Sequence, residues 1–156
     1  GALMHLTGKA LFLTFIGAMQ AAVILAVAYL LFDVAIAAHI PALILACLGT
    51  ALLSASMALL VSTLCSSPAQ MNAVSTFLVL LFSAVGGSMV PRFMMPEWLQ
   101  SVGIFTPNHW AIESFYGTLA RGQTLYDLAP VYGVLFGTSA LCLALAAVIS
   151  HRLRRL

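Results

Sequence analysis

The sequence predicts an all-α integral membrane protein, with four transmembrane helices and two short re-entrant or interfacial helices before the last span. Of the 156 residues, 63% are hydrophobic and 6% are charged, against about 45–50% and about 25% in a soluble domain. The charges are also unevenly placed, because Ala10–Phe32, Val34–Pro91 and Leu128–His151 contain no Asp, Glu, Lys or Arg. One helical crossing needs about 20 apolar residues, so the first and last intervals fit one span each and the middle interval fits two.

The same composition excludes several other classes of protein. So apolar a chain is neither a soluble globular domain nor a disordered segment. The formal net charge is only +2, and the clustered basic face of a nucleic-acid-binding protein is missing from the sequence. The three cysteines have no metal-ligand spacing, and we interpret them as small apolar packing residues.

The first predicted span covers about residues 10–32, and the second covers about 41–64. Ala18, Ala22 and Ala26 form a ridge of small residues in the first span, which permits close approach of another helix in lipid. Pro41 opens the second span, at a position where its missing N–H costs little.

The third predicted span covers about residues 69–85 and follows a short turn. Ser67 and Gln70 have the spacing of a capping box, and Pro68 stands at the first helical position between them. Gly86, Gly87 and Pro91 end this span.

The segment 91–127 is the one long stretch that does not read as a membrane span. It holds half of the charged residues and both tryptophans, which favour the membrane–water interface. Two short helices are predicted in it, at Pro96–Val102 and at Pro107–Arg121, the second ended by Gly122. Neither is long enough to cross a bilayer, so both fit helices that lie in the interface or dip into it.

The last predicted span covers about residues 128–150. Thr124 and Asp127 have capping-box spacing, but a helix starting there would be kinked by Pro130. We prefer the alternative in which Asp127 caps the helix and Pro130 lies in its first turn. Gly133 and Gly137 form a possible packing face.

The basic residues predict the orientation of the chain in the membrane. The positive-inside tendency places the C-terminal tail in the cytoplasm, and four crossings then place Lys9 there too. Both ends would be cytoplasmic, and segment 91–127 would lie on the outer side. The residues expected to make contacts on the inner side are Lys9, Arg152, Arg154 and Arg155.

No catalytic machinery is visible in the sequence. Gly8-Lys9 is followed by Ala10, where a P-loop needs Ser or Thr, so ATP binding by that route is not expected. His109 and Glu113 lie four residues apart on one helix face. That spacing suits a local polar pair, and it also resembles a metal-ligand or proton-relay spacing; two such residues do not make a metal site, and none is predicted.

The order of motifs from Gly86 onward resembles a known family. The chain resembles the C-terminal part of the membrane subunit, or permease, of bacterial type-two ATP-binding-cassette (ABC) exporters. The runs that carry the resemblance are Gly86-Gly87-Ser88-Met89-Val90-Pro91, Met95-Pro96-Glu97-Trp98-Leu99-Gln100, Phe105-Thr106-Pro107-Asn108-His109-Trp110-Ala111-Ile112-Glu113 and Leu119-Ala120-Arg121-Gly122.

The resemblance implies a permease in the bacterial cytoplasmic membrane, with its substrate path at the interface of a homo- or heterodimer. A separate ATPase subunit would bind ATP and Mg²⁺, and this chain would bind no cofactor. The family has six spans, so two spans would precede Gly1. The alternative is a membrane interaction or assembly subunit without a transport role. Residues expected in the outer gate or its re-entrant helices are Glu97, Trp98, Pro107, His109, Trp110, Glu113 and Arg121.

Overall fold

The computed structural model describes residues 1–153, and within them it contains six α-helices, two short 3-10 helices and no strand. The predicted all-helical fold class is therefore confirmed. Four helices are long and apolar enough to cross a membrane, with the second crossing counted from the preceding 3-10 helix. The elements are α1 (Ala2–Phe32), η1 (Ala37–His39), α2 (Ile40–Leu64), α3 (Pro68–Gly86), η2 (Arg92–Met94), α4 (Glu97–Gly103), α5 (Pro107–Leu119) and α6 (Ala129–Leu153).

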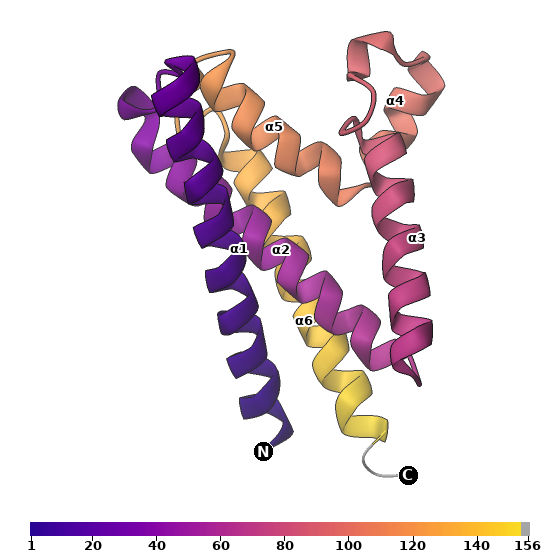
Figure 1. Cartoon of the computed structure of the whole chain (residues 1–156). Helices are drawn as coiled ribbons and strands as arrows, with labels where there is room; N and C mark the ends of the chain where they lie inside the picture. Colours follow the sequence, from indigo (N-terminus) through magenta and orange to yellow (C-terminus); the bar gives the residue numbers. More distant parts are fainter. Residues whose placement is uncertain (154–156) are drawn as a thin grey trace.

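The helices form two parts, α1, α2 and α6 on one side and α3 with α4 on the other, which are joined by the short turn between α2 and α3 at one end and by α5 toward the other. α2 crosses between α1 and α6 and packs extensively against both, whereas α3 stands apart and makes its contacts with α4, α5 and α2 (Figure 1). The two ends of the described chain lie at one end of the molecule, and η1, α4 and most of α5 lie at the other (Figure 1), called here the α4–α5 end. Because four crossings are an even number, both chain ends lie at one end of the molecule. The long connection before the last helix then lies at the other end.

The buried core lies mainly between α2 and α6. Ala46 and Leu53 of α2 pack there against Leu128, Tyr132 and Leu135. The Tyr132 hydroxyl donates a hydrogen bond of 3.0 Å to the carbonyl of Ala42, joining the two helices near their ends. Small residues allow the helices to come this close, because a Cβ built on Gly49 would lie 3.2 Å from Leu135.

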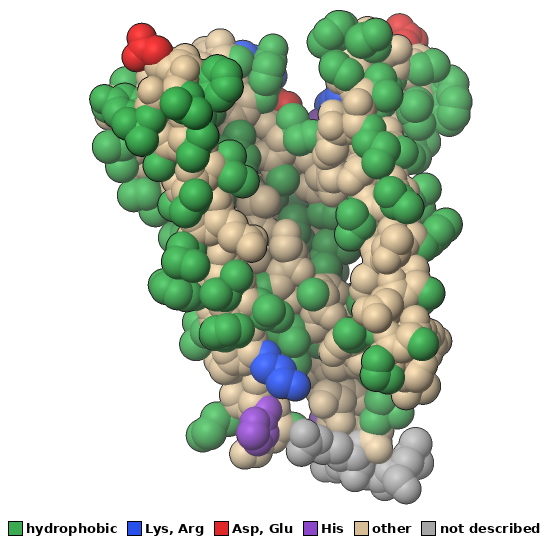
Figure 2. Space-filling model, in the orientation of Figure 1, with side chains coloured by type: hydrophobic (Ala, Val, Ile, Leu, Met, Phe, Trp, Pro, Cys, Tyr) green, Lys and Arg blue, Asp and Glu red, His purple; other side chains and the backbone are tan. Residues whose placement is uncertain are grey.

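Most of the apolar surface outside this core faces outward. Leu, Phe, Val and Ile side chains of α1 are exposed along its whole length, and hydrophobic side chains spread over the face shown in Figure 2. A helix that is apolar all round and unburied in the protein is typical of a membrane span. Gly133 and Gly137 also face outward, with nothing in the described chain within 4 Å of a built Cβ, so this pair does not pack inside the chain.

Local capping signals define where α3 and α6 begin. Ser67 accepts a hydrogen bond from the N–H of Gln70 at 3.2 Å, and the Gln70 side chain accepts one from the N–H of Ser66 at 2.8 Å. Ahead of α6, the Asp127 carboxylate accepts hydrogen bonds from the N–H and the hydroxyl of Thr124. These bonds hold the pKa of Asp127 below its usual value. α6 begins at Ala129, so Pro130 lies in its first turn as preferred above. The Asp127 carboxylate, however, bonds to Thr124 and not to an N–H of α6, and the Asp127 N–H donates to Thr124 Oγ1 at 3.4 Å, so the two residues form a reciprocal box in the turn before the helix.

Candidate functional site

The segment between α3 and α6 docks against the end of α3 through glycines. Gly87 ends α3 in the left-handed conformation, with φ +100°. A Cβ on Gly86 would lie 2.6 Å from Thr106 Oγ1 and from Asn108 Cβ, and one on Gly103 would lie 2.7 Å from the carbonyl oxygen of Val85. The backbones of α3, α4 and the start of α5 are therefore in direct contact, with no room for a side chain between them.

α5 begins deep in the molecule and rises toward the α4–α5 end (Figure 1). Thr106 caps it by accepting the N–H of His109, and Pro107 takes the first helical position as predicted. The Trp110 indole donates to the carbonyl of Ile104 at 2.7 Å. These bonds fix the direction in which α5 leaves α4. α5 ends at Leu119, two residues before the predicted end at Arg121.

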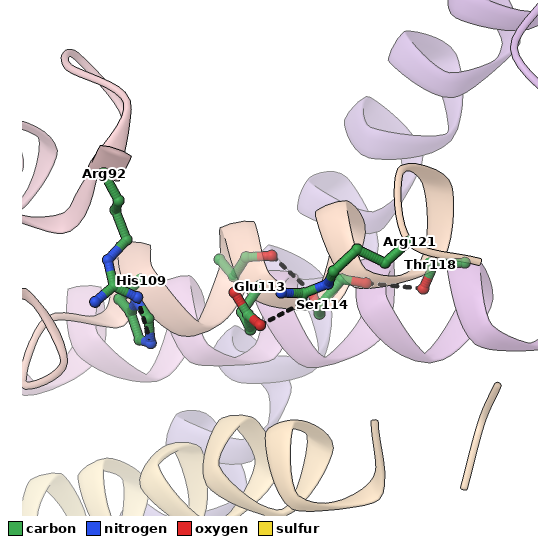
Figure 3. A network of polar contacts seen from close by, with 7 residues as sticks. Arg92, His109, Glu113, Ser114, Thr118 and Arg121 are labelled. Atoms are coloured by element: carbon green, nitrogen blue, oxygen red, sulfur yellow. Dashed lines mark hydrogen bonds and ion pairs between the residues drawn. The ribbon is translucent and has the colours of Figure 1, made fainter. Parts of the chain in front are cut away.

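Arg92 connects the loop after α3 to both short helices. Its Nη1 lies 2.8 Å from His109 Nδ1 (Figure 3). Its Nη2 donates to the carbonyl of Gln100 at 3.2 Å. Gln100 in turn donates to the carbonyl of Met95 at 2.9 Å. A guanidinium has no acceptor, so Nδ1 must accept and this imidazole is neutral, with its proton on Nε2.

The electrostatics around His109 agree with a neutral ring. Its side chain is buried, and desolvation lowers the pKa of His109 below its ordinary value. The positive charge of Arg92 lowers the pKa further, while Glu113 acts in the opposite direction. The neutral state keeps the Arg92–His109 bond intact.

Glu113 forms an ion pair with Arg121, whose guanidinium also lies 5.5 Å from the centre of the Tyr116 ring. Figure 3 shows this pair separated along α5 from the Arg92–His109 contact. His109 and Glu113 thus bind different partners and do not pair with each other. Within residues 1–153, no group of three His, Cys, Asp or Glu side chains could hold a metal ion.

The remaining predicted residues lie apart from these two contacts. Glu97 and Trp98 begin α4 and point outward, with Trp98 68% exposed. Lys9 and Arg152 are exposed at the opposite end of the molecule, and Arg154 and Arg155 lie outside the described residues. The structure therefore places His109, Trp110 and Glu113 on α5, with Arg121 just after its end and paired with Glu113, and leaves Glu97 and Trp98 separate.

Sequence reasoning missed Arg92, Gln100 and Asn108. The available signal for Arg92 was its position between two apolar pairs, Val90-Pro91 and Phe93-Met94. An arginine in apolar surroundings needs polar partners from elsewhere in the chain. No comparable signal marks Asn108, whose amide donates to Ser88 Oγ at 2.7 Å across the junction of α3 and α5.

A cavity of about 380 Å³ lies beneath the start of α5. Its walls come from one face of α2, one face of α3 and the first turns of α5. Figure 2 shows the recess between the two parts of the molecule, with hydrophobic side chains inside it. α2 and α3 diverge from the turn that joins them, so the space between them widens toward the α4–α5 end. α4 and α5 cover this wide end (Figure 1).

Comparison with known proteins identifies the family of the chain. No curated protein and no solved structure matches the chain significantly. The sequence matches the family described as ABC-2 family transporter protein over residues 1–148. The match includes all of the first five α-helices and most of α6. The chain therefore belongs to the ABC-2 transporter family, as a multi-pass membrane domain with a permease role and an ABC ATPase as its partner.

Proposed function

We propose that the chain is the permease subunit of an ATP-driven exporter in the bacterial cytoplasmic membrane, with the α4–α5 end outside and both ends of the chain in the cytoplasm. ATP and Mg²⁺ would bind the partner ATPase, and this chain would supply the substrate path. The observation that carries the proposal is that α5 contacts α2, α3 and α6 together. A tilt of α3 relative to the other spans would therefore move α5, which covers the wide end between them.

We propose further that two copies pair along α3. Asn72 and Thr76 lie on one face of α3, four residues apart, and both are exposed. Polar side chains within a membrane span face other helices or a water-filled path more readily than lipid. The exposed surface of α1 carries mainly Leu, Phe, Val and Ile, which suits lipid, and Gln20 is the one exposed Asn, Gln, Ser or Thr between residues 10 and 32.

In this proposal the α5 contacts form the outer gate. Arg92 ties the start of α5 to the loop after α3, and the Glu113–Arg121 pair holds its other end. Glu97 and Trp98 would lie at the rim of the gate, where Trp98 would anchor α4 in the interface. Lys9 and Arg152 would lie on the inner side, near the ATPase.

Crosslinking tests the pairing. In the full-length protein, with the three cysteines replaced by alanine, Thr76→Cys should give a covalent dimer with a short bifunctional thiol reagent. Leu11→Cys, which is 67% exposed on α1, serves as the matched lipid-facing control. A dimer from Leu11→Cys alone would overturn the assignment of α3 to the interface.

Thiol accessibility tests the gate. Ile112→Cys lies in the wall of the cavity, and its reaction with an impermeant maleimide should change when the ATPase is trapped with vanadate. An unchanged rate would contradict the gate. If no ATPase copurifies with the intact protein, the alternative of a membrane interaction or assembly subunit is favoured instead.

A further inference from the structure

A second cavity lies at the end of the molecule opposite α4 and α5, between the first turns of α1 and the last turns of α6. It has a volume of about 290 Å³ and is called here the α1–α6 pocket. One part of its wall is apolar, with Leu3 and Leu6 from α1 and Val148 from α6. Leu3 and Val148 are each more than half exposed, so this apolar wall is open at the surface of the protein.

The other part of the wall is polar and basic. Ser150, His151 and Arg152 contribute to it from the last turns of α6. Hydroxyl, imidazole and guanidinium groups can all donate hydrogen bonds, and a guanidinium presents two parallel donors that match a phosphate. The pocket therefore combines an apolar side with a side that is rich in donors and carries a permanent positive charge.

The chain supplies no acidic side chain near Arg152. Its four acidic residues all lie toward the α4–α5 end, where they follow α1, begin α4, lie within α5 and precede α6: Asp33, Glu97, Glu113 and Asp127. Figure 2 shows the Asp and Glu side chains of the visible face at that end. The one ion pair within residues 1–153 joins Glu113 to Arg121. An anion that neutralises Arg152 would therefore come from outside the chain.

The pocket lies at the depth where phospholipid headgroups begin. At about 1.5 Å per residue, the charge-free residues 10–32 of α1 are about 34 Å long, and residues 129–150 of α6 are about 33 Å long. Either length is enough to cross the hydrocarbon core of about 30 Å. The turns that form the pocket lie at or just beyond the ends of these lengths, at the boundary between acyl chains and headgroups.

We propose that the α1–α6 pocket binds the headgroup of an anionic phospholipid of the bilayer. Its phosphodiester would accept hydrogen bonds from Ser150 and Arg152, while the glycerol and the first carbons of the acyl chains would lie against Leu3, Leu6 and Val148. Basic pockets between transmembrane helices bind such headgroups. The volume of about 290 Å³ is near the lower limit of about 300 Å³ for small-molecule sites, so the pocket would hold the headgroup and leave the chains in the bilayer.

The lining favours this ligand over two others. The amine of a zwitterionic phospholipid would lie beside Arg152, where like charges repel and the described chain offers no carboxylate. An acidic surface of the ATPase could reach Arg152 from beyond the helix ends, but it would leave the apolar wall at Leu3 and Val148 uncovered. An anionic lipid satisfies both parts of the wall together.

Photolabelling tests the proposal. The full-length protein with its ATPase would be reconstituted in phosphatidylcholine vesicles that contain a trace of phosphatidylglycerol with a diazirine near the glycerol end of one chain, irradiated, and digested. Labelled peptides should come from residues 2–6 and 147–152. Unlabelled phosphatidylglycerol should compete, whereas phosphatidylethanolamine and inorganic phosphate at the same concentration should not.

Two pairs of variants separate a site from general attraction. Arg152→Gln should weaken competition by about 10- to 100-fold, as expected for a hydrogen bond to a charged group. Lys9→Gln removes a positive charge from the same end but not from the pocket wall, so its effect should be at most about fivefold. Ala147→Phe fills the pocket and should abolish the label, and Ala144→Phe, exposed on α6, should behave as wild type. Elution volume in gel filtration checks that each variant is folded.

Several results would overturn the proposal. Label that spreads over the lipid-facing side of α1 and is insensitive to Ala147→Phe would mean bulk lipid only. Equal losses in Arg152→Gln and Lys9→Gln would mean diffuse attraction to surface charge. Labelling that appears only after removal of the ATPase would assign the pocket to the contact with that subunit, and equal competition by inorganic phosphate would mean a phosphate site without lipid. None of these results bears on the proposed dimer or its gate, because neither includes the α1–α6 pocket.

Discussion

Arg92 and His109 lie 17 residues apart in the sequence, and their side chains meet at 2.8 Å with the imidazole as acceptor. The contact closes a loop that includes η2 and α4 and ties it to the start of α5. Because the bond needs a neutral ring, it makes the position of α4 relative to α5 sensitive to protonation of His109.

The first prediction concerns pH. Since the folded state lowers the pKa of His109, the unfolded chain binds the proton more readily, and the free energy of unfolding decreases as pH falls. The loss of stability begins at a pH of about 6.5, the ordinary pKa of histidine, and is complete below the lowered pKa of His109 in the folded protein. Thermal unfolding of the detergent-solubilised protein between pH 8 and pH 5 measures it.

His109→Gln is the informative variant for this effect, because its amide oxygen can still accept from Arg92 and does not titrate. It should retain the stability seen at pH 8 and lose most of the pH dependence in this range. His5→Gln, at an exposed position on α1, should leave the dependence as in wild type. If His109→Gln keeps the full wild-type dependence, the Arg92–His109 contact is not its source.

The second prediction separates a gate role from a structural role for Glu113. The Glu113 and Arg121 side chains are 27% and 40% exposed, so the pair should contribute no more than about 1 kcal/mol to stability. Glu113→Ala should therefore change membrane insertion and unfolding temperature little. Because the pair holds one end of α5 in the proposed gate, the same variant should abolish transport by the full-length permease. The charge-swapped variant Glu113→Arg/Arg121→Glu should recover part of the transport; unchanged transport in Glu113→Ala would remove Glu113 from the gate.

The third prediction compares two glycines. Gly86→Ala places a methyl group 2.6 Å from Thr106 and Asn108, so it should destabilise the fold by about 1–3 kcal/mol through overpacking. Gly133→Ala meets nothing within 4 Å in the described chain and lies inside α6, so it should be neutral or stabilising by up to about 1 kcal/mol. Unfolding temperatures measured side by side test the pair, and equal effects would contradict the docking of α5 on α3.

The fourth prediction concerns the bond between α2 and α6. Tyr132→Phe removes the donor to the Ala42 carbonyl and should cost about 0.5–1.5 kcal/mol. Tyr126→Phe is the control, because that side chain is 91% exposed. Chemical unfolding in mixed micelles is the measurement, and a Tyr132→Phe protein as stable as Tyr126→Phe would show that the bond contributes nothing.

Much of the fold was predictable because its signals are local or compositional. The charge-free intervals mark the apolar helices, since a charge inside a span is costly wherever the helix packs. The Ser67–Gln70 box and Pro107 mark helix starts, because capping depends on residues three or four positions apart. α1 nevertheless begins at Ala2 and includes Lys9, because a long helix continues past a charged residue that is exposed.

The contacts of the candidate site were not predictable in this way. The shared face of His109 and Glu113 on α5 follows from local sequence, because helical geometry brings residues i and i+4 together. That His109 binds Arg92 and Glu113 binds Arg121 follows from the tertiary fold, since Arg92 reaches α5 only when the chain after Gly87 folds back. Likewise, the outward direction of Gly133 and the cavity at Thr50 depend on how α2, α3 and α6 are oriented, and helix orientation follows from packing rather than from any local signal.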